Sequence, residues 1–224
     1  MAVITIHIVS DVICPWCYIG YRSLERAISL YQKTYPGGSK DEFEIVWKPY
    51  FIDKEPPAES EVISERMLRR SKDPKVVEAN QTRLTRIGAQ SNIHFNFEGR
   101  MGSSRLAHQL LHLVYLEKGS EMQCKVSEQL FRYQFELAED ISKMDVVVEA
   151  AVKAGLDEDE VADWLVSDKG IVEVEQEEKE MRATGKVGGV PHYIIGKQHL
   201  EGAVDYTEHM EAFIAAREAA ASCN

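Results

Sequence analysis

A change of hydrophobic period at Cys14-Pro15-Trp16-Cys17 constrains the fold more than any other feature of the sequence. The residues before it, Val3–Val9, are mostly β-branched and apolar, which is typical of a strand buried on both faces. From Cys17 to about Tyr35 the apolar residues recur at helical spacing, until Pro36-Gly37-Gly38 ends the pattern. A second strand pattern over Glu44–Phe51 follows, so the chain is expected to open with a β–α–β unit.

The rest of the chain changes from helical to strand patterns near residue 185. Residues 56–184 hold mainly helical spacing and few strand signals. After them, His192–Ile195 and His199–Glu201 flank Gly196-Lys197, the arrangement of a short hairpin, before a last amphipathic helix. These patterns predict three segments, which are a β–α–β part over residues 1–55, a helical insertion over 56–184 and a β–β–α part over 185–224.

The spacing of Cys14 and Cys17 is typical of a redox-active dithiol. Pro15 suits the first position of a helix, where its missing N–H is not needed. Cys14 then stands at the N-cap, where unpaired N–H groups and the helix dipole favour thiolate over thiol. We expect Cys14 to be the nucleophile and the more enclosed Cys17 to be the resolving cysteine. Two alternatives stay open, a thiol pair that only fills the core and half of a zinc site.

The other thiols and the histidines add no clear metal-binding pattern. Cys124 falls in a predicted helix and is expected to be a small core residue or a half-exposed helix thiol, and Cys223 is expected in a frayed tail. His108 and His112 share a helix face, but no third ligand accompanies them. No second pair of cysteine or histidine ligands follows the dithiol at zinc-site spacing. We therefore expect neither a metal nor a tightly bound cofactor.

The formal charge of the 224-residue chain is −11, and it is unevenly distributed. Residues 1–112 carry 15 basic and 13 acidic residues, whereas residues 113–224 carry 11 basic and 24 acidic ones. An acidic surface repels phosphate backbones and anionic lipids, so neither nucleic acid nor a membrane is an expected partner. The opening segment lacks the basic start of a signal peptide and is interpreted as a strand of the mature protein. The expected location is therefore cytoplasmic.

Three motifs give the chain a resemblance to a known family. The segment Ser10–Gly20, the run Trp47-Lys48-Pro49-Tyr50 and the run Gly188-Gly189-Val190-Pro191 together resemble the DsbA family of thioredoxin-fold proteins. Ser10–Gly20 in particular resembles the FrnE-like branch, which is related to 2-hydroxychromene-2-carboxylate isomerases and kappa-class glutathione transferases. The resemblance spans nearly the whole chain and is specific at its two ends. It implies an α/β class, thioredoxin-like fold with a large all-helical insertion.

The resemblance also implies how a substrate binds. It places a cis peptide bond before Pro191, facing the cysteines, and leaves the Val190 backbone as a short edge for an extended thiol substrate. Pro15 and Trp16 are implied to contact the substrate as well. In the isomerase and transferase relatives glutathione occupies this edge, so glutathione is a candidate co-substrate.

The chain departs from its relatives at three positions. Isomerase and kappa-type proteins commonly carry serine at the position of Cys14, so the retained dithiol favours disulfide exchange. DsbA relatives usually have histidine where Trp16 stands, and because Trp16 supplies no charge we expect a less oxidising couple. His192 follows Pro191 where the family usually has a small or aromatic residue. His192 is therefore a candidate for tuning Cys14 or binding substrate, although an ordinary strand histidine is the preferred interpretation.

Two aspartates complete the candidate site. Asp11 lies three residues before Cys14, and either relays protons to the buried thiol or hydrogen-bonds locally in a turn. Asp205 begins the last helix and is expected to be its N-cap. By resemblance to the glutathione-binding relatives, the Val204-Asp205 turn is also a candidate contact for the glutathione amino group.

Three hypotheses of function follow, and the first is preferred. A DsbA-like oxidoreductase would exchange disulfides with thiol or disulfide substrates, either glutathione or a protein. A glutathione-dependent isomerase or transferase would instead use Cys14 to position the glutathione sulfur against an aromatic or polyketide-like molecule. A redox-switched binding or chaperone module would present an apolar groove and carry out no turnover. Both a monomer and a homodimer are compatible with the sequence.

Overall fold

The strand that opens the chain lies inside a four-stranded sheet. The computed structural model describes residues 1–222. In it, β1 (Val3–Ser10) pairs in parallel with β2 (Glu42–Pro49) and antiparallel with β5 (His192–Ile195). The antiparallel β6 (Gln198–Glu201) completes the order β2-β1-β5-β6. The predicted central strand and the predicted hairpin are both confirmed.

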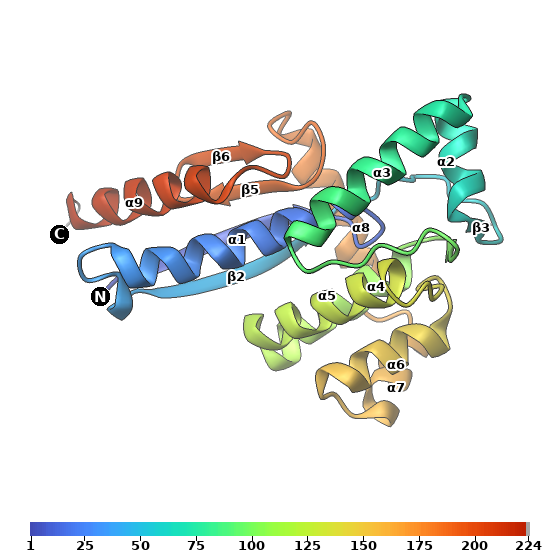
Figure 1. Cartoon of the computed structure of the whole chain (residues 1–224). Coiled ribbons are helices and arrows are strands. Elements are labelled where there is room, and N and C mark those ends of the chain that lie inside the picture. The colour runs from blue at the N-terminus through green and yellow to red at the C-terminus, as the bar shows by residue number, and fades with distance from the viewer. Residues whose placement is uncertain (223–224) are drawn as a thin grey trace.

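Two helices, α1 (Pro15–Thr34) and α9 (Tyr206–Ser222), pack against each other on one face of this sheet (Figure 1). α1 begins where expected, because Cys14 precedes it in an extended conformation and Pro15 occupies its first position. The chain turns after α1 at Gly37, whose φ of 80° favours glycine. The predicted β–α–β opening is confirmed, with small shifts of the element boundaries.

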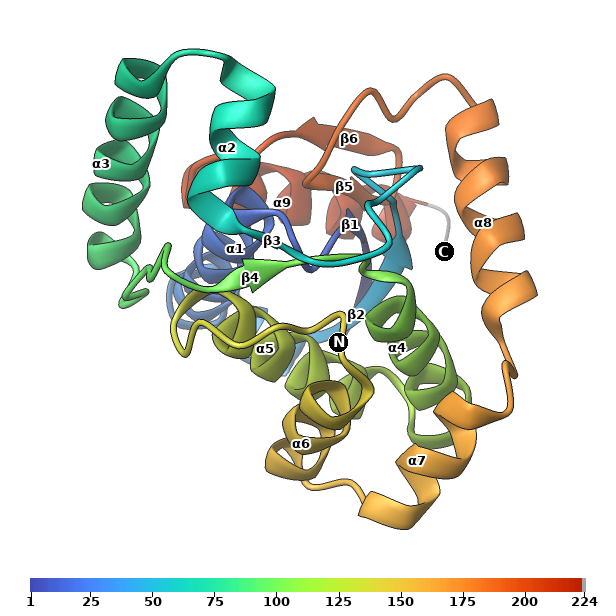
Figure 2. The same cartoon turned by 90° about the vertical axis from the view of Figure 1, so that its right-hand side faces the viewer.

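The insertion between β2 and β5 surrounds the sheet on several sides. Figure 2 shows α2 and α3 on one side of the strands and α8 on the other, with α4 to α7 between them. The helical insertion is confirmed. It also holds a short β3–β4 pair, which was not predicted because a strand of two residues is too short to show an alternating hydrophobic pattern. Across residues 1–222 every helix is too short or too polar to span a bilayer. The bounds are η1 (Gly38–Lys40, ahead of β2), β3 (Glu61–Val62), α2 (Ile63–Ser71), α3 (Pro74–Gln90), β4 (Arg100–Met101), α4 (Arg105–Lys118), α5 (Ser120–Phe135), α6 (Met144–Ala154), α7 (Glu158–Val166) and α8 (Ile171–Ala183).

One hydrophobic core joins the sheet, α1 and the insertion. Phe131 of α5 stacks on Tyr18 of α1 with ring centroids 5.2 Å apart, and its ring centroid lies 5.7 Å from that of Trp47 on β2. Cys124 is partly buried in the same region and accepts a hydrogen bond from the Trp47 indole N–H at 3.4 Å. Its expected place, as a core residue or a half-exposed thiol on a helix, is confirmed. Cys223, expected in a frayed tail, lies outside the described residues.

Candidate active site

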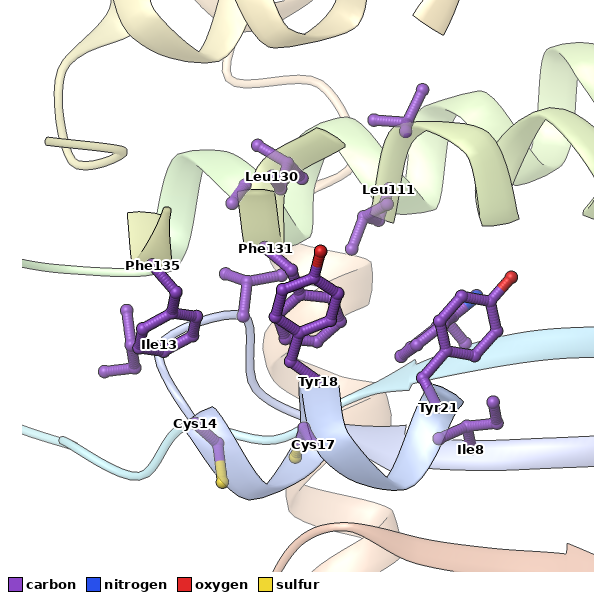
Figure 3. Close-up of a cluster of buried hydrophobic side chains, with 14 of the residues drawn as sticks. Ile8, Ile13, Cys14, Cys17, Tyr18, Tyr21, Leu111, Leu130, Phe131 and Phe135 are labelled. Atoms are coloured by element: carbon purple, nitrogen blue, oxygen red, sulfur yellow. The ribbon is translucent and has the colours of Figure 1, made fainter. Parts of the chain in front are cut away.

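The two cysteines of the predicted dithiol lie at the N-terminal end of α1, and both sulfurs are free. The Cys14 carbonyl accepts hydrogen bonds from the Cys17 N–H at 3.0 Å and the Tyr18 N–H at 3.4 Å. Both sulfurs project to the same side of the helix, away from the Tyr18 ring (Figure 3). Cys14 is 5% exposed and Cys17 is 1% exposed. Cys14 is therefore the more exposed of the two thiols.

The Cys17 thiol is enclosed by protein. Burial raises the pKa of Cys17 well above its usual range, and the neighbouring Cys14 thiol raises that pKa further. Polar contacts with the Ser10 hydroxyl and the Asp11 backbone N–H act in the opposite direction, with a smaller effect. The thiol form of Cys17 is therefore favoured over the thiolate.

The peptide bond between Val190 and Pro191 is cis, as the resemblance implied, and lies beside the dithiol. The Cys14 thiol donates to the Val190 carbonyl oxygen over 3.7 Å. The Pro191 carbonyl accepts a hydrogen bond from the Gly202 N–H at 2.8 Å, which ties this loop to the turn before α9. Gly188-Gly189 is exposed, so the backbone ahead of Val190 is accessible to an extended ligand.

Asp11 is fully buried close to the dithiol. Its Oδ1 accepts a hydrogen bond from the Ile13 N–H at 3.3 Å, and its Oδ2 accepts one from the Ile52 N–H at 2.8 Å. The local hydrogen bonding expected of Asp11 is therefore present. His108 of α4 also brings its Nε2 to 3.4 Å from Asp11 Oδ1. Sequence reasoning missed this pair, because almost a hundred residues separate its members and no local pattern connects them.

A small cavity of about 30 Å³ is lined by Ser10 and His108. Ser10 Oγ and His108 Nε2 are both buried, and neither makes a hydrogen bond of ordinary geometry. A cavity of this size holds one or two water molecules, which need roughly 10–15 Å³ each. Lys48 and Glu177, a partly exposed ion pair at 2.6 Å, form another part of its wall. His112 also lines it, yet within residues 1–222 no three His, Cys, Asp or Glu side chains are grouped as metal ligands.

His192 and Asp205 lie away from the two sulfurs. Tyr193 faces α1, so its neighbour His192 points to the opposite face of the sheet. His192 Nε2 lies 2.9 Å from Nδ1 of His199 on β6, which places it as a strand histidine. Asp205 accepts a hydrogen bond from the Thr207 N–H at 2.9 Å, in keeping with an N-cap of α9. Its contact with glutathione stays a prediction.

Tyr193 is a residue near the dithiol that sequence reasoning missed. Its side chain is fully buried, and its hydroxyl has no hydrogen-bond partner among residues 1–222. Burial raises the pKa of Tyr193 well above its usual range, and interaction with Cys17 and Cys14 adds to the shift. The hydroxyl lies against Gly20 of α1 and leaves no room there for a Cβ. The sequence could have pointed to Tyr193 through its spacing from Pro191. Residues two apart on a strand share a face, and Pro191 was expected to face the cysteines.

A larger cavity, of about 250 Å³, opens beside Cys14 between the start of α1 and the insertion. Pro15 and Trp16 are half-buried in its wall. The guanidinium of Arg83 lies 4.8 Å from the centre of the Trp16 ring. Most of the remaining wall is apolar, and two arginines of α2 are charged members of it. These residues include Ile63, Met67, Leu84, Phe135, Arg66 and Arg70.

Two comparisons of sequence give different results. A family model described as "DSBA-like thioredoxin domain" matches residues 5–213, which include the dithiol and the cis-proline loop. No curated protein sequence matches the chain.

Solved structures share the whole architecture at low sequence identity. A probable DsbA oxidoreductase from Streptomyces coelicolor has a TM-score of 0.82 and 23% identity, covering 96% of this chain and 90% of that chain. A 2-hydroxychromene-2-carboxylate isomerase has a TM-score of 0.66 and 15% identity, covering 98% and 99%. The cytosolic disulfide reductase DsbM from Pseudomonas aeruginosa, solved with GSH, has a TM-score of 0.59 and 13% identity, covering 97% and 98%. At these identities the likeness shows the fold alone.

Proposed function

The chain belongs to the DSBA-like thioredoxin domain family, and from that premise we propose that it is a thiol–disulfide oxidoreductase whose working group is the Cys14–Cys17 dithiol. The observation that carries the proposal is the position of the Cys14 sulfur, at a helix N-cap and 3.7 Å from the Val190 carbonyl oxygen. A thiol at that position has dipolar stabilisation of its thiolate from the helix and an adjacent backbone edge for substrate.

The proposed reaction proceeds through two exchanges of sulfur bonds. The Cys14 thiolate attacks one sulfur of a substrate disulfide, forms a mixed disulfide and releases the other sulfur as a thiolate. Cys17 then loses its proton and attacks the Cys14 sulfur, which forms the Cys14–Cys17 disulfide and releases the second thiolate. Two electrons pass from the dithiol to the substrate. The reverse sequence oxidises a pair of substrate thiols.

Asp11 and His108 are proposed to accept the Cys17 proton. The burial of Cys17 makes this proton the difficult one to remove. Ser10, whose hydroxyl interacts with the Cys17 sulfur, lines the same small cavity as His108, and His108 Nε2 lies 3.4 Å from Asp11 Oδ1. A variant with Asp11→Asn should therefore slow the second exchange more than the first.

Glutathione and a cytoplasmic location are the finer parts of the proposal. The Val190 edge, Pro191, Pro15 and Trp16 are proposed to bind the substrate around Cys14. DsbM, which shares the fold, is described as cytosolic and was solved with GSH. A thiol or disulfide substrate containing glutathione is consistent with a site whose nucleophile lies in a narrow space.

A redox titration against glutathione tests the proposal, with thiols trapped and masses read at each ratio. The expected result is a reversible Cys14–Cys17 disulfide with a potential within the range of roughly −270 to −120 mV that thioredoxin and DsbA span. Cys17→Ser should accumulate a mixed disulfide on Cys14, and Cys14→Ser should form none. Failure of an internal disulfide to form, with no mixed disulfide on Cys17→Ser, would contradict the proposal.

A glutathione-dependent isomerase or transferase is the second candidate, favoured by the apolar cavity beside Cys14. The two candidates differ in what they need from Cys17. Disulfide turnover should be lost in Cys17→Ser, whereas isomerase turnover should largely survive it. A redox-switched chaperone would instead keep its folding-assistance activity in a variant that lacks both thiols.

A further inference from the structure

The α2–α3 hairpin is positively charged in an acidic protein. Residues 63–90 hold seven basic and three acidic residues, a balance of +4 in a chain of net charge −11. In Figure 2 this hairpin stands on one side of the strands, and its residues line the cavity beside Cys14. The basic residues are Arg66, Arg69, Arg70, Lys72, Lys75, Arg83 and Arg86, and the acidic ones are Glu65, Asp73 and Glu78.

Two arginines of α2 line the cavity itself. Arg66 is only 4% exposed and forms ion pairs with Asp53 and, at 3.9 Å, with Glu61. Nη1 is the atom that faces Glu61, so the charge of Arg66 is already balanced by two carboxylates. Arg70 is exposed one helical turn later and has no ion-pair partner within residues 1–222.

The remaining wall of the cavity is apolar. Met67 and Leu84 face it from the hairpin, and Phe135 and Ile13 from the side of the dithiol. Its volume of about 250 Å³ is near the lower end of small-molecule sites, which run from roughly 300 to 1,000 Å³. Such a space accepts one ring or a short branched chain. The nearby cations add an attraction for negative charge.

We propose that this cavity binds the apolar, carboxylate-bearing group of a low-molecular-weight thiol or disulfide, and so selects the substrate of Cys14. The inference rests on the proposed function and names the substrate class for it. The carboxylate lies toward Arg70, and the apolar body packs on Met67 and Leu84. The sulfur of the same group then lies next to Cys14, where the first exchange forms the mixed disulfide and releases the second sulfur as a thiolate.

Three small disulfides separate the contributions of charge and apolar surface. Dithiobis(nitrobenzoic acid) is aromatic and anionic, dithiodipyridine is aromatic and neutral, and glutathione disulfide is anionic and polar. The second-order rate of modification at Cys14 is measured for each on the reduced full chain, with the modified residue identified by mass. Each rate is divided by that of N-acetylcysteine, which removes the intrinsic reactivity of the probe.

The aromatic anion is expected to show the largest normalised rate, with Arg70→Gln lowering it roughly two- to fivefold, the effect of one partly exposed charge. The same change should leave dithiodipyridine unaffected, and added salt should weaken only the anionic probes. Met67→Gln should slow both aromatic probes. Arg86→Gln is the matched control, because Arg86 is an exposed arginine of the same hairpin that does not line this cavity.

Two outcomes overturn the inference while leaving the oxidoreductase proposal intact. In one, Cys14 discriminates among the probes no more than N-acetylcysteine does. In the other, Arg86→Gln acts like Arg70→Gln, or glutathione disulfide matches the aromatic anion, which shows general attraction without an apolar site. If Cys14 reacts with no probe and forms no disulfide with Cys17, the proposed function fails together with the inference.

Discussion

At the scale of single residues, Gly20 of α1 leaves the space that the Tyr193 hydroxyl occupies near the dithiol. The place that a Cβ would take at Gly20 is filled by the Tyr193 hydroxyl, and the Pro191 Cγ lies 3.2 Å away. Gly20→Ala should lower the free energy of unfolding by about 1–3 kcal/mol through overpacking. This loss should appear although alanine favours a helix by about 1 kcal/mol over glycine. Denaturant unfolding measures the difference.

A double-mutant cycle identifies the cause of that loss. In a Tyr193→Phe background the hydroxyl is gone, so Gly20→Ala should be much less destabilising. Gly188→Ala is the matched control, since Gly188 has open space around it. An equal loss in both backgrounds would mean that the Tyr193 hydroxyl is not what Gly20 accommodates.

His209 contributes to the pH dependence of the molecule's stability. Burial lowers its pKa from 6.5 to about 4, and both ring nitrogens are buried without hydrogen-bond partners between Tyr193 and Phe213. As pH falls, His209 therefore binds a proton in the unfolded chain at a higher pH than it does in the folded chain. Stability due to the neutral ring is complete above about pH 6.5 and is lost as pH falls toward 4, by up to about 3 kcal/mol.

Denaturant unfolding at pH 7, 5.5 and 4 checks this expectation. His209→Leu should make the stability less dependent on pH in that window, because it removes the titrating group and leaves no polar atom unpaired. His94→Leu serves as control, since His94 is exposed. The same slope in His209→Leu as in the parent chain would show that other groups cause the dependence.

At the scale of elements, one side chain of the insertion completes the edge of the sheet. β2 is an edge strand, and Gln123 of α5 accepts a hydrogen bond from the Trp47 N–H at 2.9 Å. Its amide N–H group donates to the carbonyl oxygens of Trp47 at 3.3 Å and of Leu111 at 3.1 Å. α5 is thus held by backbone groups that another strand would otherwise pair with.

Replacing the Gln123 amide should remove the stabilising hydrogen bonds between α5 and the edge strand β2. Gln123→Met keeps a similar volume but leaves buried backbone groups unpaired, so the free energy of unfolding should fall by roughly 2–4 kcal/mol. Gln176→Met on α8 is the control, because Gln176 is exposed. A loss no larger than that of the control would show that water or rearrangement replaces the three hydrogen bonds.

At the scale of the whole molecule, the predicted three segments share one core. Residues of the opening unit, the insertion and the final hairpin all belong to the same buried cluster. We therefore expect one cooperative unfolding transition. In each variant that retains a single tryptophan, Trp47 of β2 or Trp164 of α7, fluorescence and far-UV circular dichroism should report the same midpoint. Separate midpoints would show that the insertion unfolds as an independent domain.

Local chemistry accounts for the elements that could be predicted. The change of period around Cys14 indicated a strand and a helix, because side-chain periodicity and proline placement depend on neighbouring residues. The greater enclosure of Cys17 followed from its place one turn into that helix. The β3–β4 pair escaped prediction because each strand has only two residues.

The sequence by itself determined the order of the elements and the two unequal thiols, since these depend on residues within a few turns of each other. Only the tertiary structure decided what surrounds those thiols. The resemblance placed Val190 near Cys14, but nothing in the sequence placed His108 of the insertion against Asp11, or the Tyr193 hydroxyl against Gly20. Such neighbours depend on how distant segments pack into one core, and no local period or motif records that packing.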